Sequence, residues 1–241
     1  MTELEKTEVQ KQPWGAPAAL IVGFIAYVVS QLSVGLLVWP FVKDGTQASL
    51  DKIQVPWVSL VLTALSSAVM LGVVILFLRR KHFKVRDFGF FRPTLKSVLF
   101  AVGAYIGYFA VFLVSVTLIT ALVPSFNESE AQDVGFIGAQ GWQLVLAFIG
   151  LVIIAPITEE IFFRGFLFRG LRRSWPLWLA FIGTSAAFAL AHGQWNVGID
   201  TFILSLFLIL VYQKTGNLWL SIAMHATKNL IAFLFLFVFV S

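Results

Sequence analysis

Cysteine is absent from the sequence, and charged residues are scarce in it. Without cysteine the chain forms no disulfide bond, and thiol nucleophiles and thiolate-ligated metal sites are excluded. Only 12% of the 241 residues are charged, whereas 59% are hydrophobic. In a soluble domain about a quarter of the residues are charged. The shortage of charge therefore indicates an integral membrane protein.

Three motifs that carry hydrolytic chemistry in other proteins are also missing. The chain has no Gly-x-Ser-x-Gly turn, no His-Glu-x-x-His helix and no pair of aspartates for an intramembrane aspartyl site. These absences exclude a serine nucleophile of that type and the usual zinc-binding helix of metalloproteases. Any catalytic chemistry must therefore come from the few other polar residues in the apolar segments.

Seven apolar segments are candidates for transmembrane helices. A span needs about 20 apolar residues, and the first segment exceeds the length of a signal-peptide core. The segments between residues 155 and 215 are short, so six or eight spans remain open. The predicted spans are residues 16–38, 55–78, 97–123, a fourth that starts near residue 142, and then 177–191, 199–212 and 218–240.

These segments predict an all-α fold, a polytopic membrane helix bundle of about seven transmembrane helices. Residues 1–12 are polar and mixed in charge, and we expect them to form a cytoplasmic tail. Residues 13–241 are expected to form a single membrane-embedded domain, because the sequence shows no tandem repeat, no low-complexity tract and no second domain.

Loop charges predict the orientation of the bundle. Residues 79–96 form the most basic segment, which the positive-inside rule places in the cytoplasm. The loop 124–141 then lies outside, and it holds Glu128, Glu130 and Asp133 without any lysine or arginine. We therefore expect a multi-pass protein of the plasma membrane with a cytoplasmic N-terminus and an external C-terminus. The net charge of +5 reflects such loops, so no nucleic-acid partner is expected.

Residues 155–173 place two adjacent carboxylates and an arginine within an apolar segment. An ionisable group in a membrane span is costly and usually functional. In a helix Glu160 and Arg164, four residues apart, lie on one face and can neutralise each other. Glu159 points about 100° away and gains no such partner. Glu159 is therefore the carboxylate at which we expect chemistry.

A proline and a turn set the position of Glu159 relative to His192. Pro156 cannot donate a backbone hydrogen bond, so we expect the helix to kink or restart there, with Thr158 available as a cap. The turn at residues 174–176 then reverses the chain. In the resulting hairpin, Glu159 and His192 lie within roughly 3 Å of the same level along the axis.

His225 and Asn229 add a polar face on the last span, because their spacing of four puts them on one side of a helix. A glutamate in an apolar cavity can act as a general base toward water. The histidines could hold that water, stabilise an oxyanion or ligate a metal, and Asn229 offers the amide donor of an oxyanion hole. With the other hydrolytic motifs missing, a glutamate-centred hydrolysis remains.

Three motifs in this order resemble the CAAX protease and bacteriocin-processing (CPBP, or Abi) family of intramembrane endopeptidases, which includes the type II CAAX prenyl endopeptidases. The resemblance covers about residues 142–233, and the first three spans match only in being apolar. The motifs are Glu159-Glu160-x-x-x-Arg164, Phe188-x-x-x-His192 and His225-x-x-x-Asn229.

The resemblance implies an endopeptidase that acts on membrane-associated substrates, either prenylated CAAX-type proteins or bacteriocin- and signal-type peptides. It implies that Glu159 activates the water, that His192 helps to position it, and that His225 with Asn229 stabilises the oxyanion. The residues expected to support the site are Glu160, Arg164 and Phe188. Lys228, beside Asn229, is a departure that the resemblance does not explain.

The resemblance leaves the metal open. Glu159, His192 and His225 make one oxygen and two nitrogen ligands, a set that catalytic zinc uses. These ligands come from three helices, however, and no histidine pair at a spacing of four pre-forms the site. We therefore favour a metal-free, glutamate-activated water, with no cofactor.

Two other classes of function stay open from the sequence. A catalytically silent membrane scaffold or immunity protein would keep the same residues without turnover. A small-solute transporter also places ionisable groups inside a bundle, but it is expected to show two related halves with broken helices, and we find no such symmetry.

Overall fold

The structure is a computed structural model, and it describes residues 13–42, 55–123, 125–127, 135–136 and 138–239. Within these residues the chain is helical and contains no β-strand, so the predicted all-α class is confirmed. The helices are α2 (Ala16–Val42), α4 (Pro56–Arg80), the 3-10 turn η1 (Val85–Phe88), α5 (Leu95–Leu122), α6 (Gln143–Phe148), η2 (Ile149–Ile154), α7 (Ala155–Glu160), η3 (Ile161–Phe168), α8 (Arg169–Ser174), α9 (Leu177–Leu190), α10 (Trp195–Thr215), α11 (Leu218–Leu234) and η4 (Phe235–Phe239).

Six helices in the described part of the chain are long and apolar enough to cross a membrane. The fourth of them is continuous from α6 to α8 and spans Gln143–Ser174. The predicted multi-pass bundle is therefore confirmed, with boundaries close to those expected.

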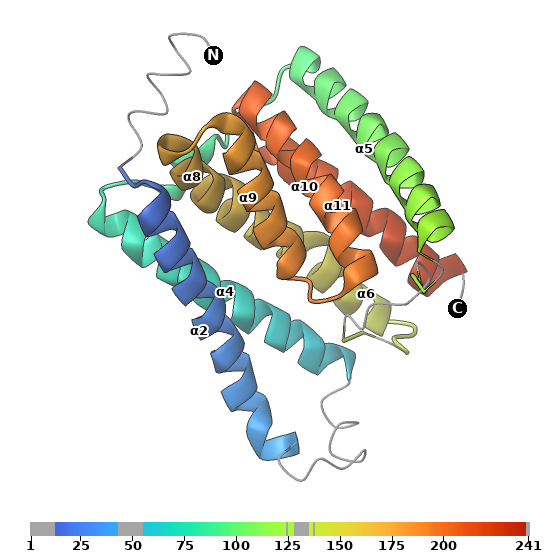
Figure 1. The fold of residues 1–241 in the computed structure, drawn as a ribbon. Coiled ribbons are helices and arrows are strands. Elements are labelled where there is room, and N and C mark those ends of the chain that lie inside the picture. Colours follow the sequence, from blue (N-terminus) through green and yellow to red (C-terminus); the bar gives the residue numbers. More distant parts are fainter. Residues whose placement is uncertain (1–12, 43–54, 124, 128–134, 137, 240–241) are drawn as a thin grey trace.

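The seventh apolar helix, α9, is shorter, with 14 residues. At 1.5 Å per residue it is about 21 Å long, against about 30 Å for the hydrocarbon core of a bilayer. The helix starts at the same end of the bundle as α8 and stops before it reaches the other end (Figure 1). The residues that follow it, including His192, therefore lie inside the bundle and not at its end.

The central helix passes through Pro156 without restarting, contrary to one of the two expected outcomes. Its hydrogen bonding changes instead to the wider π pattern in η2, directly before Pro156. A proline removes one donor and its ring crowds the preceding turn, and a π-helical turn accommodates both. Thr158 consequently lies inside the helix and does not cap it.

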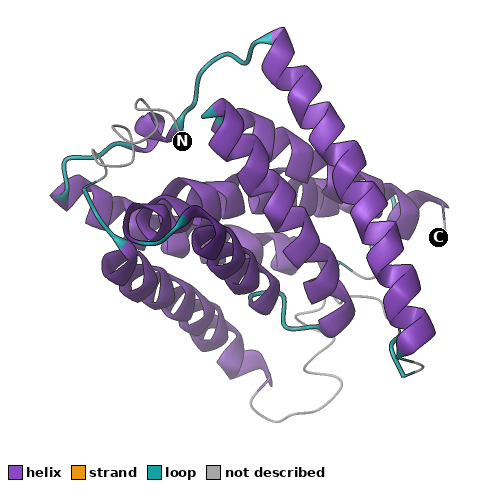
Figure 2. Cartoon of the chain, turned by 45° about the horizontal axis from the view of Figure 1, so that its top comes forward, coloured by secondary structure: helices purple, strands orange, loops and turns teal. Residues whose placement is uncertain are grey.

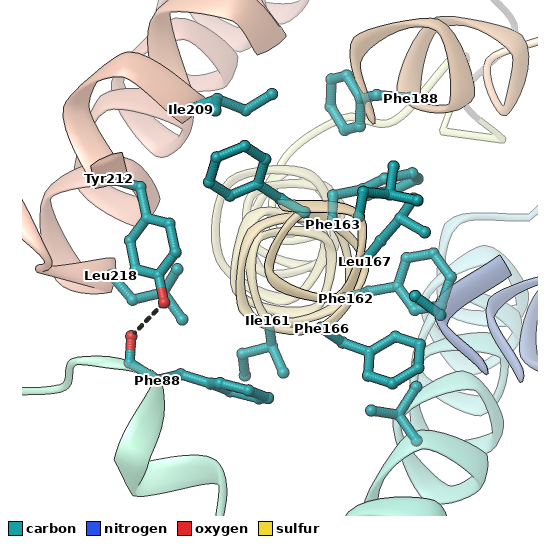
Figure 3. Packing of buried hydrophobic residues seen from close by; sticks show 14 of the residues in the cluster. Phe88, Ile161, Phe162, Phe163, Phe166, Leu167, Phe188, Ile209, Tyr212 and Leu218 are labelled. Atoms are coloured by element: carbon teal, nitrogen blue, oxygen red, sulfur yellow. Dashed lines mark hydrogen bonds between the residues drawn. The ribbon is translucent and has the colours of Figure 1, made fainter. Parts of the chain in front are cut away.

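Residues of η3 are buried on every side of the helix. Figure 3 shows this helix end-on, with Phe162, Phe163 and Phe166 pointing in different directions into the surrounding helices. Gly165 lets Phe88 pack closely against the same helix, because a Cβ at this position would lie 2.8 Å from the Phe88 ring. Arg164 therefore lies in a helical segment whose residues are all buried, directly after the two glutamates of α7.

The other helices surround this central helix. Helices α2 and α4 pack against each other on one side, and α5 packs against α10 on the far side (Figures 1 and 2). Helix α11 contacts η2 and α7, and α9 contacts η3. Helix α11, which carries His225, and helix α9, which ends just before His192, thus both border the central helix.

The basic segment is fixed to one end of this bundle. The hydroxyl of Tyr212 donates to the carbonyl of Phe88 at 2.9 Å (Figure 3). The amide of Asn217 donates to the carbonyl of Phe91 at 2.8 Å. Arg169 donates to the Tyr212 hydroxyl at 2.9 Å. Residues 79–96 therefore lie at the same end of the bundle as the arginines of α8, as expected if both basic segments are on one side of the membrane. Residues 128–134, which hold the predicted acidic cluster, are outside the described residues.

Candidate active site

Glu160 forms the centre of a buried charged cluster. Its Oε1 accepts hydrogen bonds from Nη1 of Arg164 at 2.8 Å and from Nδ1 of His225 at 2.9 Å. Glu160 and Arg164 are fully buried, and His225 is nearly so. The ion pair expected from the spacing of four is thus present, and the same carboxylate also binds a histidine on α11.

This contact determines the tautomer of His225. A carboxylate paired with arginine only accepts hydrogen bonds, so Nδ1 of His225 carries the proton. In the neutral ring Nε2 is then an acceptor, and it lies 3.8 Å from Oε2 of Glu159. This distance is too long for a direct hydrogen bond. Two acceptors that face each other in this way are suited to bind the two hydrogens of one water molecule.

Glu159 differs from its neighbour in its surroundings. Its side chain keeps 25% of its surface exposed, whereas that of Glu160 has none. Glu159 therefore combines access from outside the core with a position beside His225, as a group that contacts a substrate must.

His192 lies just beyond the end of α9, on the first turn after the helix. Its Nδ1 bonds to the carbonyl of Phe188 at 2.8 Å, which again leaves Nε2 as the free ring nitrogen. The Phe188 ring packs edge-on against both imidazoles, with centroids 4.9 Å from His192 and 5.7 Å from His225. The guanidinium of Arg164 lies 4.5 Å from the centre of the same ring. Phe188 therefore joins the two histidines and the ion pair into one cluster.

Asn229 is turned toward the central helix. Its amide nitrogen donates to the backbone carbonyl of Leu151 in η2 at 2.9 Å. This bond is a contact between two helices, and the oxyanion role that the sequence predicts for Asn229 stays a prediction.

The predicted ligand trio does not form a metal site in the part of the chain that the structure describes. No three histidine, aspartate, glutamate or cysteine side chains there lie close enough together to hold a metal ion. The free Nε2 atoms of both histidines are of the kind that metals bind. Glu159 and His225 lie close enough to share an ion, but no third ligand lies beside them in the described residues.

A second polar cluster lies beside the site and was not predicted. The amine of Lys228 pairs with Asp200 of α10 at 2.8 Å, and the hydroxyl of Tyr108 of α5 donates to the other oxygen of Asp200. This cluster accounts for Lys228, which the family resemblance does not explain. The available signal was Asp200 itself, an aspartate within an apolar segment.

Two apolar grooves flank α9. The first has a volume of about 360 Å³ and is lined by α2, η3 and α9, including Phe163, Ala187 and Ala191. The second, of about 660 Å³, lies between α5, α9 and α10, and Gly193 lines it. Leu190 borders both grooves. Apolar space therefore adjoins the His192 turn on either side.

Comparison with known proteins supports the family resemblance. Residues 141–231 match the type II CAAX prenyl endopeptidase Rce1-like family. An uncharacterized 24.3 kDa protein of Escherichia coli is 30% identical over 98 residues, which cover 38% of this chain. The matched part spans 45% of the length of that relative. No solved structure matches the chain. The matched residues contain every member of the cluster around Glu160.

Proposed function

We propose that this chain, as a member of the Rce1-like family of type II CAAX prenyl endopeptidases, hydrolyses peptide bonds of membrane-associated substrates with a water activated by Glu159. The observation that carries the proposal is the pair formed by Glu159 and His225. Oε2 of Glu159 and Nε2 of His225 lie 3.8 Å apart at the edge of a buried charged cluster.

In this proposal the water lies between Oε2 of Glu159 and Nε2 of His225. Glu159 takes one proton of the water while the water oxygen bonds to the carbonyl carbon of the substrate. The resulting carboxylic acid returns the proton to the amine nitrogen as the carbon–nitrogen bond breaks. General acid–base catalysis of this kind contributes about 10²–10⁴ in rate.

Glu160 and Arg164 support this chemistry without contacting the substrate. Glu160 holds the Nδ1 proton of His225, so that Nε2 stays an acceptor toward the water. Arg164 pairs with Glu160 and provides its counter-charge at a fully buried position. His192, held by its own contact with Phe188, lies on the turn after α9, and we propose that its Nε2 acts on the substrate rather than on the water.

We further propose that the reaction needs no metal ion. The carboxylate and the imidazole already provide two acceptors for the water, and their helices offer no third ligand beside them within the described residues. Activity of purified protein should therefore survive exhaustive chelation. Stoichiometric zinc in active protein, with activity lost on its removal and restored on its return, would contradict this expectation.

The substrates proposed are proteins or peptides held at the membrane, since both grooves beside α9 are lined almost entirely by apolar side chains. Peptide pairs that differ only in a prenyl group distinguish a CAAX-type substrate from a bacteriocin- or signal-type peptide.

The decisive experiment is cleavage of a membrane-anchored peptide by purified protein. Glu159→Gln keeps the shape of the side chain and removes the base, so turnover should fall at least about 100-fold. Asp87→Asn, a matched change at an exposed position of η1, should leave turnover unchanged. A wild-type protein without Glu159-dependent cleavage of any peptide would instead favour the silent scaffold.

A further inference from the structure

We infer that Asn229 is a positioning residue, which donates to a carbonyl that Pro156 leaves without a helical donor and so fixes α11 against the turn before Glu159. This inference rests on the proposed function and deepens it. It replaces the oxyanion role expected for Asn229 with a role that acts through the backbone of Leu151.

The argument starts from the hydrogen bonds of the π-helical turn. The N–H of Ala155 donates to the carbonyl of Gly150, five residues earlier. The next π-type bond would join the N–H of residue 156 to the carbonyl of Leu151, but residue 156 is a proline and has no N–H. The Leu151 carbonyl therefore receives neither the N–H of Ala155, which goes to Gly150, nor an N–H from residue 156.

Asn229 supplies the missing donor. Its amide nitrogen lies 2.9 Å from the Leu151 oxygen, although the two residues are 78 positions apart in the chain. The bond is partly buried, and a carbonyl without a donor costs free energy inside a bilayer, where no bulk water replaces the bond. Asn229 and Pro156 therefore form a functional pair across two helices.

The bond joins the two helices that carry the groups proposed to hold the water. On α11, Asn229 is one turn after His225, and on the central helix Leu151 is two turns before Glu159. A donor on one helix and an acceptor on the other fix their relative position at this level. The distance between Glu159 and His225 depends on that position, and small displacements of catalytic groups are costly.

An oxyanion donor and a positioning residue can be separated by a double-mutant cycle. Asn229→Leu keeps the shape of the side chain and removes the donor. Pro156→Ala returns a backbone N–H at the position from which Leu151 can accept a bond in the π pattern. The set comprises wild type, both single variants and the double variant, and the measurements are kcat, KM and the melting temperature in detergent.

We expect Asn229→Leu to lower kcat about tenfold or more with little change in KM, because the carbonyl left without a donor distorts the site. The melting temperature should fall as well. Pro156→Ala should rescue most of both losses, since it supplies Leu151 with a new donor. If Asn229→Leu costs the same in kcat when it is combined with Pro156→Ala as it does in the wild type, Asn229 acts directly on the substrate and the inference is wrong.

Two outcomes outside the kinetics also decide the inference. If Asn229→Leu does not fold, a double variant that folds supports the inference. If the double variant also does not fold while Pro156→Ala alone does, the inference is wrong. Should the wild type show no Glu159-dependent cleavage, the proposed function fails, and the melting temperatures still test the pair. Additive changes in melting temperature would then exclude the coupling.

Discussion

Two adjacent glutamates of this chain lie in different surroundings, and this difference separates their roles. Glu160 is fully buried and accepts bonds from Arg164 and His225. Glu159 is partly exposed and faces His225 at a distance that leaves room for an exchangeable partner. One carboxylate therefore holds the site together, and the other is available for the substrate.

This division predicts different effects of the same change at the two positions. Glu160→Gln leaves Arg164 without its counter-charge at a buried position, and removal of one partner of a buried ion pair costs about 3–5 kcal/mol. Glu160→Gln should therefore lower both the melting temperature and the activity, whereas Glu159→Gln should lower only the activity. Thermal unfolding of both variants in one detergent checks this expectation. Equal melting temperatures would show that the division of roles is wrong.

The sequence was informative where spacing within one helix decides a contact. The pair Glu160–Arg164 follows from a spacing of four, and it is present. The bond from His225 to Glu160 joins residues 65 positions apart, and only the packing of α11 on α7 decides which of the two glutamates it meets. Helical periodicity carries no information on that choice.

At the scale of elements, helix α11 is held by polar contacts along its length. The hydroxyl of Ser221 donates to the carbonyl of Leu208 on α10, His225 binds Glu160, and Lys228 binds Asp200. Polar groups in a membrane bundle turn toward one another because lipid offers them no partner. The rule holds for this bundle, because the helices that carry the polar faces lie side by side.

The ion pair between Lys228 and Asp200 should stabilise the contact of α11 with α10. Lys228→Met leaves Asp200 without its cation, and Asp200→Asn leaves Lys228 without its anion, so each single change should lower the melting temperature. The double variant should be more stable than the sum of the single losses indicates, because neither charge is then unpaired. Lys214→Met, which removes an exposed cation from the end of α10, is the control. Additive losses would mean that the two residues act independently.

The wide turn before Pro156 was the part of the central helix that the sequence did not predict. A proline indicates a missing donor and a crowded turn, so a disturbance was expected at this place. It does not indicate whether the chain responds with a break, a bend or a π-helical turn. That choice depends on the partner that takes over the freed carbonyl, and here the partner is Asn229 on a distant helix.

At the scale of the whole molecule, the site lies far from the basic end. Glu159 is 15 residues from the end of α8 at Ser174, which corresponds to about 20 Å of helix. The basic segment 79–96 is attached at that end through Tyr212 and Asn217. If the positive-inside rule holds, the proposed catalytic cluster lies in the outer half of the bilayer, and the short helix α9 ends beside it.

The absence of cysteine makes this orientation directly testable, because any single cysteine that is introduced is the only thiol in the chain. Arg86 lies exposed in the basic segment, and Gln140 lies exposed just before α6 at the other end of the bundle. With the N-terminus in the cytoplasm, a membrane-impermeant maleimide should label Gln140→Cys in intact cells. It should label Arg86→Cys only after permeabilisation, with the unlabelled cysteine-free protein as the control. Labelling of both positions from the same side would contradict the alternation of the spans. Labelling of Arg86→Cys alone in intact cells would show that the bundle has the opposite orientation, with the site in the cytoplasmic half.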